Sequence, residues 1–159
     1  MTLTATRTMK ANRPFPVVVV ITLLTVLGLG AVGGGYAMTF GIGGEDFMPQ
    51  EYLEALPLVN SWLVPGLVLM IGFGLGSLLV GYGVMRRPRW SWIAGLERLS
   101  GHHWSWIGTI LIGVGQVVWI TLELVSIPFS MLMPIFGSVG LALALLPLTR
   151  TVRAYLETR

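Results

Sequence analysis

The stretch "VVVVITLLTVLGLG", residues 17–30, decides the fold class of this chain. Its residues do not alternate between polar and apolar, as the strands of a membrane barrel do. It belongs to an apolar run from about Phe15 to Phe40 that contains no charged residue. A helix needs about 20 apolar residues to cross the hydrocarbon core of a bilayer. The run therefore predicts a transmembrane helix.

Three further segments have the same character, at about residues 62–85, 104–126 and 129–148. Backbone polar groups cannot stay unpaired in lipid, which favours helices. The chain is 54% hydrophobic and only 11% charged, whereas soluble domains carry roughly 25% charged residues. No linker or repeat divides it. We therefore predict an all-α polytopic membrane protein, in which residues 1–159 form one domain of four transmembrane helices in an antiparallel bundle.

The charged residues predict the orientation of this bundle. All ten basic residues fall on one side of the predicted spans. They are Arg7, Lys10, Arg13, Arg86, Arg87, Arg89, Arg98, Arg150, Arg153 and Arg159. By the positive-inside rule, both termini and the middle loop lie in the cytoplasm. An alternative is that the basic start, the apolar run and "AVGGGYAM" at 31–38 form a secretory signal peptide, although the run is longer than a usual signal core.

The first loop on the opposite side contains four carboxylates, Glu45, Asp46, Glu51 and Glu54. We expect a short helix here, with Asp46 as its cap, Pro49 in its first turn and Pro57 at its end. The carboxylates either form a divalent-cation site or are simply solvated. Their spacing gives little convergence for calcium, so the solvated acidic loop is the favoured interpretation.

The middle loop, "RRPRWSWIAGLERLSGHHWSW" at 86–106, combines arginines with tryptophans. Tryptophans are typical of the membrane–water interface. We expect one or two helical turns at residues 92–100, lying on the membrane surface. The basic side chains predicted to face headgroups are Arg86, Arg87, Arg89 and Arg98. Such a loop either anchors the helices, which we favour, or binds anionic headgroups.

Two adjacent histidines, His102 and His103, are the candidates for a metal or haem site. Neighbouring residues of a helix point about 100° apart, so they are poorly placed to share a metal. Interface histidines are the favoured interpretation. The chain has no cysteine, which excludes thiolate nucleophiles and zinc–cysteine sites. We predict no catalytic residue, no metal, no cofactor and no nucleic-acid partner.

Glycines suggest how the spans pack. "GLGAVG" at 28–33 matches a dinucleotide-binding motif only in letters, because it lies inside a membrane span. Glycines four residues apart let helix backbones approach closely. Such pairs are Gly30 with Gly34 and Gly72 with Gly76. They predict tight packing, within one chain or by self-association, and Gly108 and Gly113 thin the third span in the same way.

Glu123 is the one carboxylate inside a predicted span. Thr109, Gln116 and Glu123 are seven residues apart, and Trp119 lies on the same helix face. A charge facing lipid is unfavourable. We therefore expect this polar stripe to face the bundle interior, in the half of the membrane away from the arginines.

The partner of Glu123 is not a basic residue, because none lies in that half of the membrane. The second and fourth spans begin there, and helix N-termini offer free N–H groups. We predict that Glu123 meets one of these ends, near Asn60, Ser61 or Ser130, or is protonated. The stripe is either a polar lock between helices, which we favour, or a site that handles protons or cations.

Several stretches resemble a group of small bacterial four-helix membrane proteins of uncharacterised function. They are "WLVPGL" at 62–67, "RRPRW" at 86–90 and "GVGQVVWITLELVSIPFSMLMPIFGSVGLALALLPLTRTVRAYL" at 113–156. The resemblance covers roughly residues 57–156. It implies a protein of the bacterial cytoplasmic membrane and brings no substrate, cofactor or catalytic residue.

The sequence thus favours an accessory or interaction subunit of the membrane, because it is small and lacks a catalytic constellation. The alternative is a small proton- or ion-coupled transporter that uses Glu123 and Gln116. An intramembrane enzyme ranks last, because a serine near Glu123 has no histidine beside it.

Overall fold

The computed structural model describes residues 13–41, 50–54, 61–126 and 128–158. Every regular element in these ranges is a helix, apart from an isolated bridge between His102 and Glu157, so the all-α prediction is confirmed. The elements are α1 (Phe15–Phe40), α3 (Gln50–Glu54), α4 (Leu63–Leu67), η1 (Val68–Leu75), α5 (Gly76–Arg86), η2 (Ser91–Ile93), α6 (Ala94–Ser100), α7 (Trp104–Ser126), α8 (Leu132–Leu145), η3 (Leu146–Leu148) and α9 (Arg150–Leu156).

Three helices are long and apolar enough to cross a membrane: Phe15–Phe40, Leu63–Arg86 and Trp104–Ser126. They agree closely with the first three predicted spans. The second combines α4, η1 and α5, and its middle part, η1, has the wider hydrogen-bonding pattern of a π-helix. Stretches of π-helix are rare and often mark functional regions.

The fourth predicted span is shorter than expected. Its helix begins at Leu132 and, after Leu148, the chain bends by 69° into α9. Proline has no N–H and clashes with the carbonyl four residues earlier. Pro147 therefore ends the α-helix at Leu145 and leaves a short 3-10 turn. Leu132–Leu148 reaches the length of a span only together with α9, which makes three spanning helices, or up to four.

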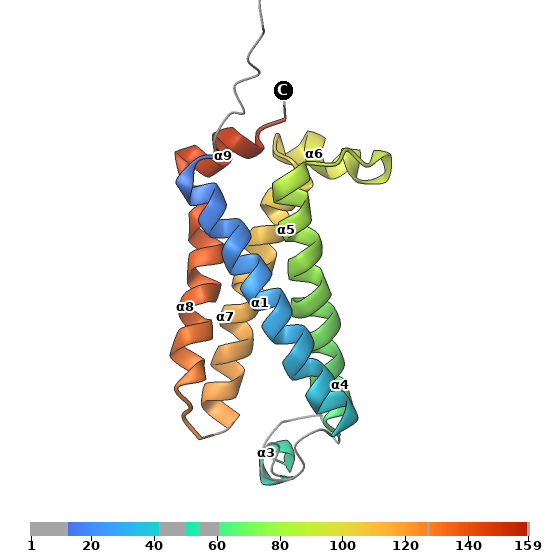
Figure 1. Cartoon of the computed structure of the whole chain (residues 1–159), viewed down its shortest axis with the longest axis vertical. Coiled ribbons are helices and arrows are strands. Elements are labelled where there is room, and N and C mark those ends of the chain that lie inside the picture. Colours follow the sequence, from blue (N-terminus) through green and yellow to red (C-terminus); the bar gives the residue numbers. More distant parts are fainter. Residues whose placement is uncertain (1–12, 42–49, 55–60, 127, 159) are drawn as a thin grey trace, which may run out of the picture.

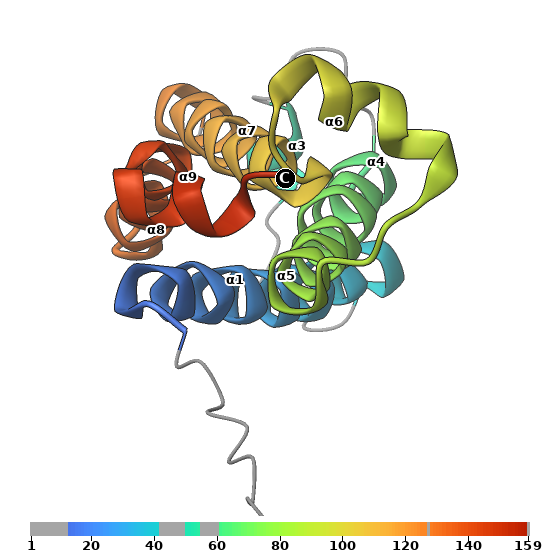
Figure 2. The same ribbon diagram turned by 90° about the horizontal axis from the view of Figure 1, so that it is seen from above.

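The helices lie side by side, and α6 and α9 lie across one end of them (Figure 1, Figure 2). Hydrogen bonds of two arginines join separate segments there. The guanidinium of Arg13 donates to the Met85 carbonyl at 3.1 Å, and that of Arg87 donates to the Tyr155 carbonyl at 3.0 Å. We call this the arginine end, because it bears Arg13, Arg86, Arg87, Arg89, Arg98, Arg150 and Arg153. The opposite end, where α3 lies, is called the α3 end (Figure 1).

The buried core belongs mainly to the half of the molecule near the arginine end. The residues that form it are Val17, Val20, Leu24, Leu27, Val80, Val84, Trp104, Leu143, Val152 and Leu156. By contrast, α7 has no buried residue after Ile120. Large apolar side chains such as Leu29, Leu111 and Leu122 are exposed on the outer faces of the helices.

Glycines let the helices approach closely at several crossings. A methyl group added to Gly35 of α1 would lie 2.5 Å from the Gly66 carbonyl oxygen of α4. One added to Gly113 of α7 would collide with the backbone of Leu143 and Ala144 in α8. Real atoms do not approach so closely, so only glycine fits these positions.

The glycine pairs singled out in the sequence are not the closest contacts. A methyl group on Gly30 or Gly72 would meet nothing within 4 Å in the described part of the chain, so these two glycines do not serve packing within it. On Gly34 or Gly76 it would touch only one side chain, at 3.4 Å. Gly30 and Gly72 are exposed on outward faces of their helices. Self-association through them stays a prediction.

Candidate functional site

The polar stripe of α7 faces the interior at its first two positions. Thr109 is fully buried and Gln116 is 3% exposed, as predicted. The Thr109 hydroxyl donates to the Ser105 carbonyl at 2.7 Å. The stem of Gln116 packs against Gly140 of α8. Its side-chain oxygen has no hydrogen-bond donor among the described residues. A buried polar atom without a hydrogen-bond partner is energetically unfavourable, and such atoms are rare in folded proteins.

Glu123 lies at the half-buried end of the stripe. The indole N–H of Trp119 donates to its carboxylate at 2.6 Å. The two residues are four apart on α7, so the bond forms along one helix face. The Trp119 ring also meets Phe73 of η1 edge-on, with centroids 5.9 Å apart. Trp119 therefore links Glu123 to the second spanning helix.

The predicted partners of Glu123 do not hydrogen-bond to it in the part of the chain that the structure describes. Asn60 lies outside the described residues. Ser61 is exposed, and the Ser130 hydroxyl oxygen instead accepts from the Leu132 N–H at 3.3 Å, at the start of α8. The prediction that a serine at a helix end is the partner of Glu123 is therefore wrong for both serines. The Trp119 indole lies one turn away on the same helix, so its bond to Glu123 needs no contact between helices.

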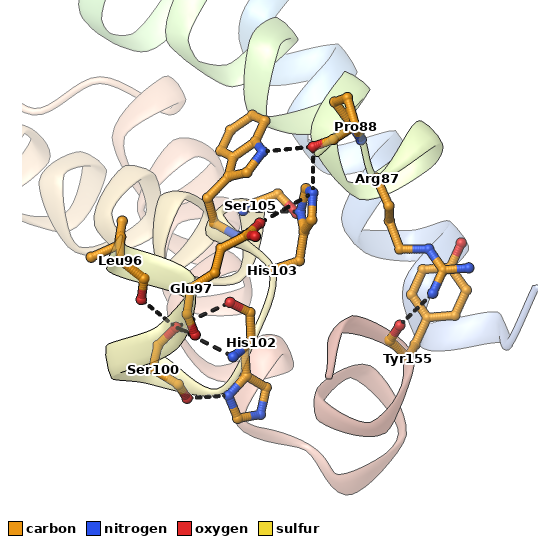
Figure 3. A network of polar contacts seen from close by, with 10 residues as sticks. Arg87, Pro88, Leu96, Glu97, Ser100, His102, His103, Ser105 and Tyr155 are labelled. Carbon is orange, nitrogen blue, oxygen red and sulfur yellow. Dashed lines mark hydrogen bonds and ion pairs between the residues drawn. The ribbon is translucent and has the colours of Figure 1, made fainter. Parts of the chain in front are cut away.

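The arginines predicted to face headgroups, Arg86, Arg87, Arg89 and Arg98, are all exposed. Arg87 is the most constrained of them. It ends α5 in the left-handed conformation, with φ 49° and ψ 53°. Its guanidinium lies 4.5 Å from the centre of the Tyr155 ring while it donates to the Tyr155 carbonyl (Figure 3).

The tryptophans of the middle loop stack on one another. Trp90 lies between Trp92 and Trp104, with centroid separations of 5.8 Å and 5.0 Å. The indole N–H of Trp106 donates to the Pro147 carbonyl at 2.8 Å, where the fourth segment bends. The helical turns expected between Trp92 and Ser100 are present as η2 and α6.

A polar network around His103 is the feature that the sequence analysis missed (Figure 3). His103 is 4% exposed, so it is not a surface residue. Its Nε2 lies 3.0 Å from the Pro88 carbonyl, which can only accept, so Nε2 carries a proton. In the neutral ring Nδ1 then accepts, here from the Ser105 hydroxyl at 2.8 Å.

Glu97 of α6 completes this network. Its carboxylate oxygen lies 3.6 Å from His103 Nε2 and accepts the Trp104 N–H at 3.2 Å. Trp104 begins α7, so Glu97 satisfies one of the free N–H groups of that helix. The His103 backbone N–H donates to the Leu156 carbonyl at 2.7 Å. The network therefore joins the chain after α5 to α6, α7 and α9.

Serine, histidine and glutamate together resemble the components of a hydrolase, but this arrangement is closed. Ser105 is fully buried, and a methyl group on Gly83 of α5 would lie only 2.9 Å from its Cβ. General-base catalysis would require a substrate carbonyl to reach that hydroxyl, and the close approach of α5 to Ser105 leaves it little access. We interpret the network as a structural lock between segments.

His102 does not join His103 at a shared site. Its Nδ1 lies 2.7 Å from the Ser100 carbonyl, and its ring stacks on Trp106 at 4.6 Å. Within the described ranges no three histidine or carboxylate side chains come together as metal ligands. The arginine end instead carries a pocket of about 850 Å³ between the start of α1, the end of α5 and α9.

Comparison with protein families finds no model that matches this chain. Comparison with curated proteins and with solved structures finds no match either.

Proposed function

We propose that the protein is an integral protein of the bacterial cytoplasmic membrane, with its arginine end in the cytoplasm. The support is the contrast between exposed apolar side chains along the long helices and the arginines gathered at one end. Lipid favours the exposed apolar side chains, and the positive-inside rule assigns the arginines to the cytoplasm. The resemblance to small bacterial four-helix proteins supports the bacterial assignment.

Reporter fusions at the C-terminus test this orientation. A green fluorescent protein fused after Arg159 should fluoresce, whereas alkaline phosphatase at the same position should be inactive. The opposite pattern would place the arginine end outside the cytoplasm and contradict the proposal. A phosphatase inserted in the loop that contains α3 is the matched positive control.

Within this membrane we place the protein as an accessory or interaction subunit. One observation carries this role: the first two positions of the polar stripe of α7 are packed between helices rather than lining a passage. Thr109 and Gln116 are buried against neighbouring helices, and the glycine contact between α7 and α8 brings their backbones together. The groove between α7 and α8 towards the α3 end, about 360 Å³, is lined mainly by apolar side chains.

Affinity purification from native membranes tests the accessory role. A partner should copurify in a fixed ratio with the wild-type chain. The outward glycines offer a sharp variant, because Gly72→Leu adds a side chain where nothing in the described chain is within 4 Å. It should reduce copurification and leave the unfolding temperature of the isolated chain unchanged. Recovery of the chain alone, with wild type and variant behaving alike, would contradict the role.

A second candidate is a small proton- or ion-coupled carrier. It is favoured by the position of Glu123 within an apolar helix and by the side-chain oxygen of Gln116 on the same face, which has no hydrogen-bond donor among the residues that the structure describes. Intramembrane carboxylates are common in such pathways. In liposomes, pH-dependent uptake that Glu123→Gln abolishes would support the carrier. Glu123→Gln thus separates the two candidates. Loss of uptake supports the carrier, whereas copurification with a partner that is unaffected by Glu123→Gln supports an accessory role that does not use this carboxylate.

A further inference from the structure

The pocket at the arginine end is built from segments that are far apart in the sequence. Its lining includes Arg13 before α1, Arg86, Arg87 and Arg89 around the end of α5, and Tyr155 and Glu157 around the end of α9. Its volume of about 850 Å³ is within the range of small-molecule sites. The pocket therefore exists only when α1, α5 and α9 have come together.

The charge of this pocket is unbalanced. Among the residues that the structure describes, four arginines and one carboxylate, that of Glu157, line it. Within the described ranges none of these arginines forms an ion pair, since the ion pair found there joins His103 to Glu97. Like charges held close together repel, and an anion bound between them removes that repulsion.

Two of the arginines are held in position by the protein. Arg13 donates to the Met85 carbonyl, and Arg87 donates to the Tyr155 carbonyl while stacking on that ring. Each bond uses one N–H of a guanidinium that has five, so donors remain for a ligand. Both side chains are thus oriented before any ligand arrives, which lowers the entropy that binding must overcome.

The backbone at Arg87 adds to this picture. A left-handed conformation at a helix end is usually taken by glycine, because a side chain there is sterically unfavourable. At φ 49° an arginine takes it instead, and this turn directs the chain towards Arg89. Strain of this kind concentrates at functional sites.

From these observations we propose that the pocket binds a phosphate group, carried either by an anionic phospholipid headgroup or by a soluble phosphate ester. Guanidinium groups match phosphate because they form paired, charge-assisted hydrogen bonds. Arg86 and Arg89 are exposed and have no side-chain hydrogen bond in the described chain, so they supply free donors beside the two fixed arginines. The inference does not depend on the accessory role.

Binding is measured by titration calorimetry on the purified full chain in neutral detergent at fixed ionic strength. The probes are dihexanoyl-phosphatidylglycerol, glycerol 3-phosphate and, as the neutral comparison, dihexanoyl-phosphatidylcholine. The pocket variant is Arg86→Gln with Arg89→Gln. The matched control is Arg98→Gln with Arg153→Gln, which removes the same charge from exposed residues of the arginine end outside the pocket lining.

We expect the pocket variant to bind roughly 30-fold more weakly, from about 1 kcal/mol for each arginine. The control should change less than about 2-fold.

Binding of phosphatidylglycerol alone identifies a lipid headgroup as the source of the phosphate, and binding of glycerol 3-phosphate as well identifies a soluble ester. Equal weakening in both variants would show diffuse attraction and overturn the proposal, as would wild-type binding no tighter than that of phosphatidylcholine. Circular dichroism confirms that each variant is folded.

Discussion

The two ends of the molecule hold a carboxylate beside helix α7 in different ways. Near the arginine end, Glu97 reaches α7 from another helix and belongs to a network that also includes His103 and Pro88. Towards the α3 end, Glu123 accepts a hydrogen bond from Trp119 of its own helix. The first arrangement requires the tertiary fold, whereas the second requires only a helix.

Core packing follows the same division. Buried side chains of α1, α5, α8 and α9 meet near the arginine end, and α7 contributes no buried residue after Ile120. Regions with few buried contacts open at lower free energy than the core. We therefore expect the arginine end to determine global stability and the α3 end to determine local motion. Three predictions test this difference, in order of expected effect.

Gly113→Val should have the largest effect. The added side chain would collide with the backbone of Leu143 and Ala144, which cannot move as a flexible side chain can. We expect a loss of about 3 kcal/mol or more of unfolding free energy. Denaturant unfolding in detergent measures it. Gly72→Val is the control, because a methyl group there meets nothing within 4 Å in the described chain. Equal effects of the two changes would contradict the helix crossing.

His103→Leu should have the next largest effect. It removes the acceptor of the Ser105 hydroxyl and the donor to Pro88, deep in the network. An unsatisfied buried polar group costs about 1–3 kcal/mol. The control is His102→Leu, since that ring is only half-buried and should contribute less. If the histidines are equivalent in thermal unfolding, the proposed lock at the arginine end is wrong.

Trp119 and Glu123 should give the smallest effect. Trp119→Phe keeps a ring against Phe73 but removes the donor to the carboxylate. Combined with Glu123→Gln in a double-mutant cycle, it should reveal a coupling energy of about 1 kcal/mol. Hydrogen exchange should show this change confined to the α3 end. A coupling near zero would mean that the bond does not contribute to stability.

The sequence-based predictions succeeded where the determinant was local. Thr109 and Gln116 are buried because seven residues make almost two helical turns, and that spacing is visible in the sequence. The network around His103 was missed because Pro88 and Glu97 reach it from other segments. The bend at Pro147 had a local signal, the proline itself, but the predicted fourth span continued past this residue to 148.

Among the glycines, only contacts distinguish those that face a neighbour. Gly30 and Gly35 lie on the same helix, yet one is open and the other meets the Gly66 carbonyl. Sequence spacing records helix periodicity but not the direction of the neighbouring helix. The face that α1 turns towards α4 therefore decides which of its glycines are in contact.

The sequence alone determined that the chain is helical, apolar over long segments, and basic at defined positions before, between and after them. These properties depend on single residues and on periodicity along one helix. Only the tertiary structure decided that Arg13, Arg87 and Tyr155 meet at one pocket, and that His103 is buried rather than exposed. Such juxtapositions depend on how the helix ends fold over one another, which no local pattern records.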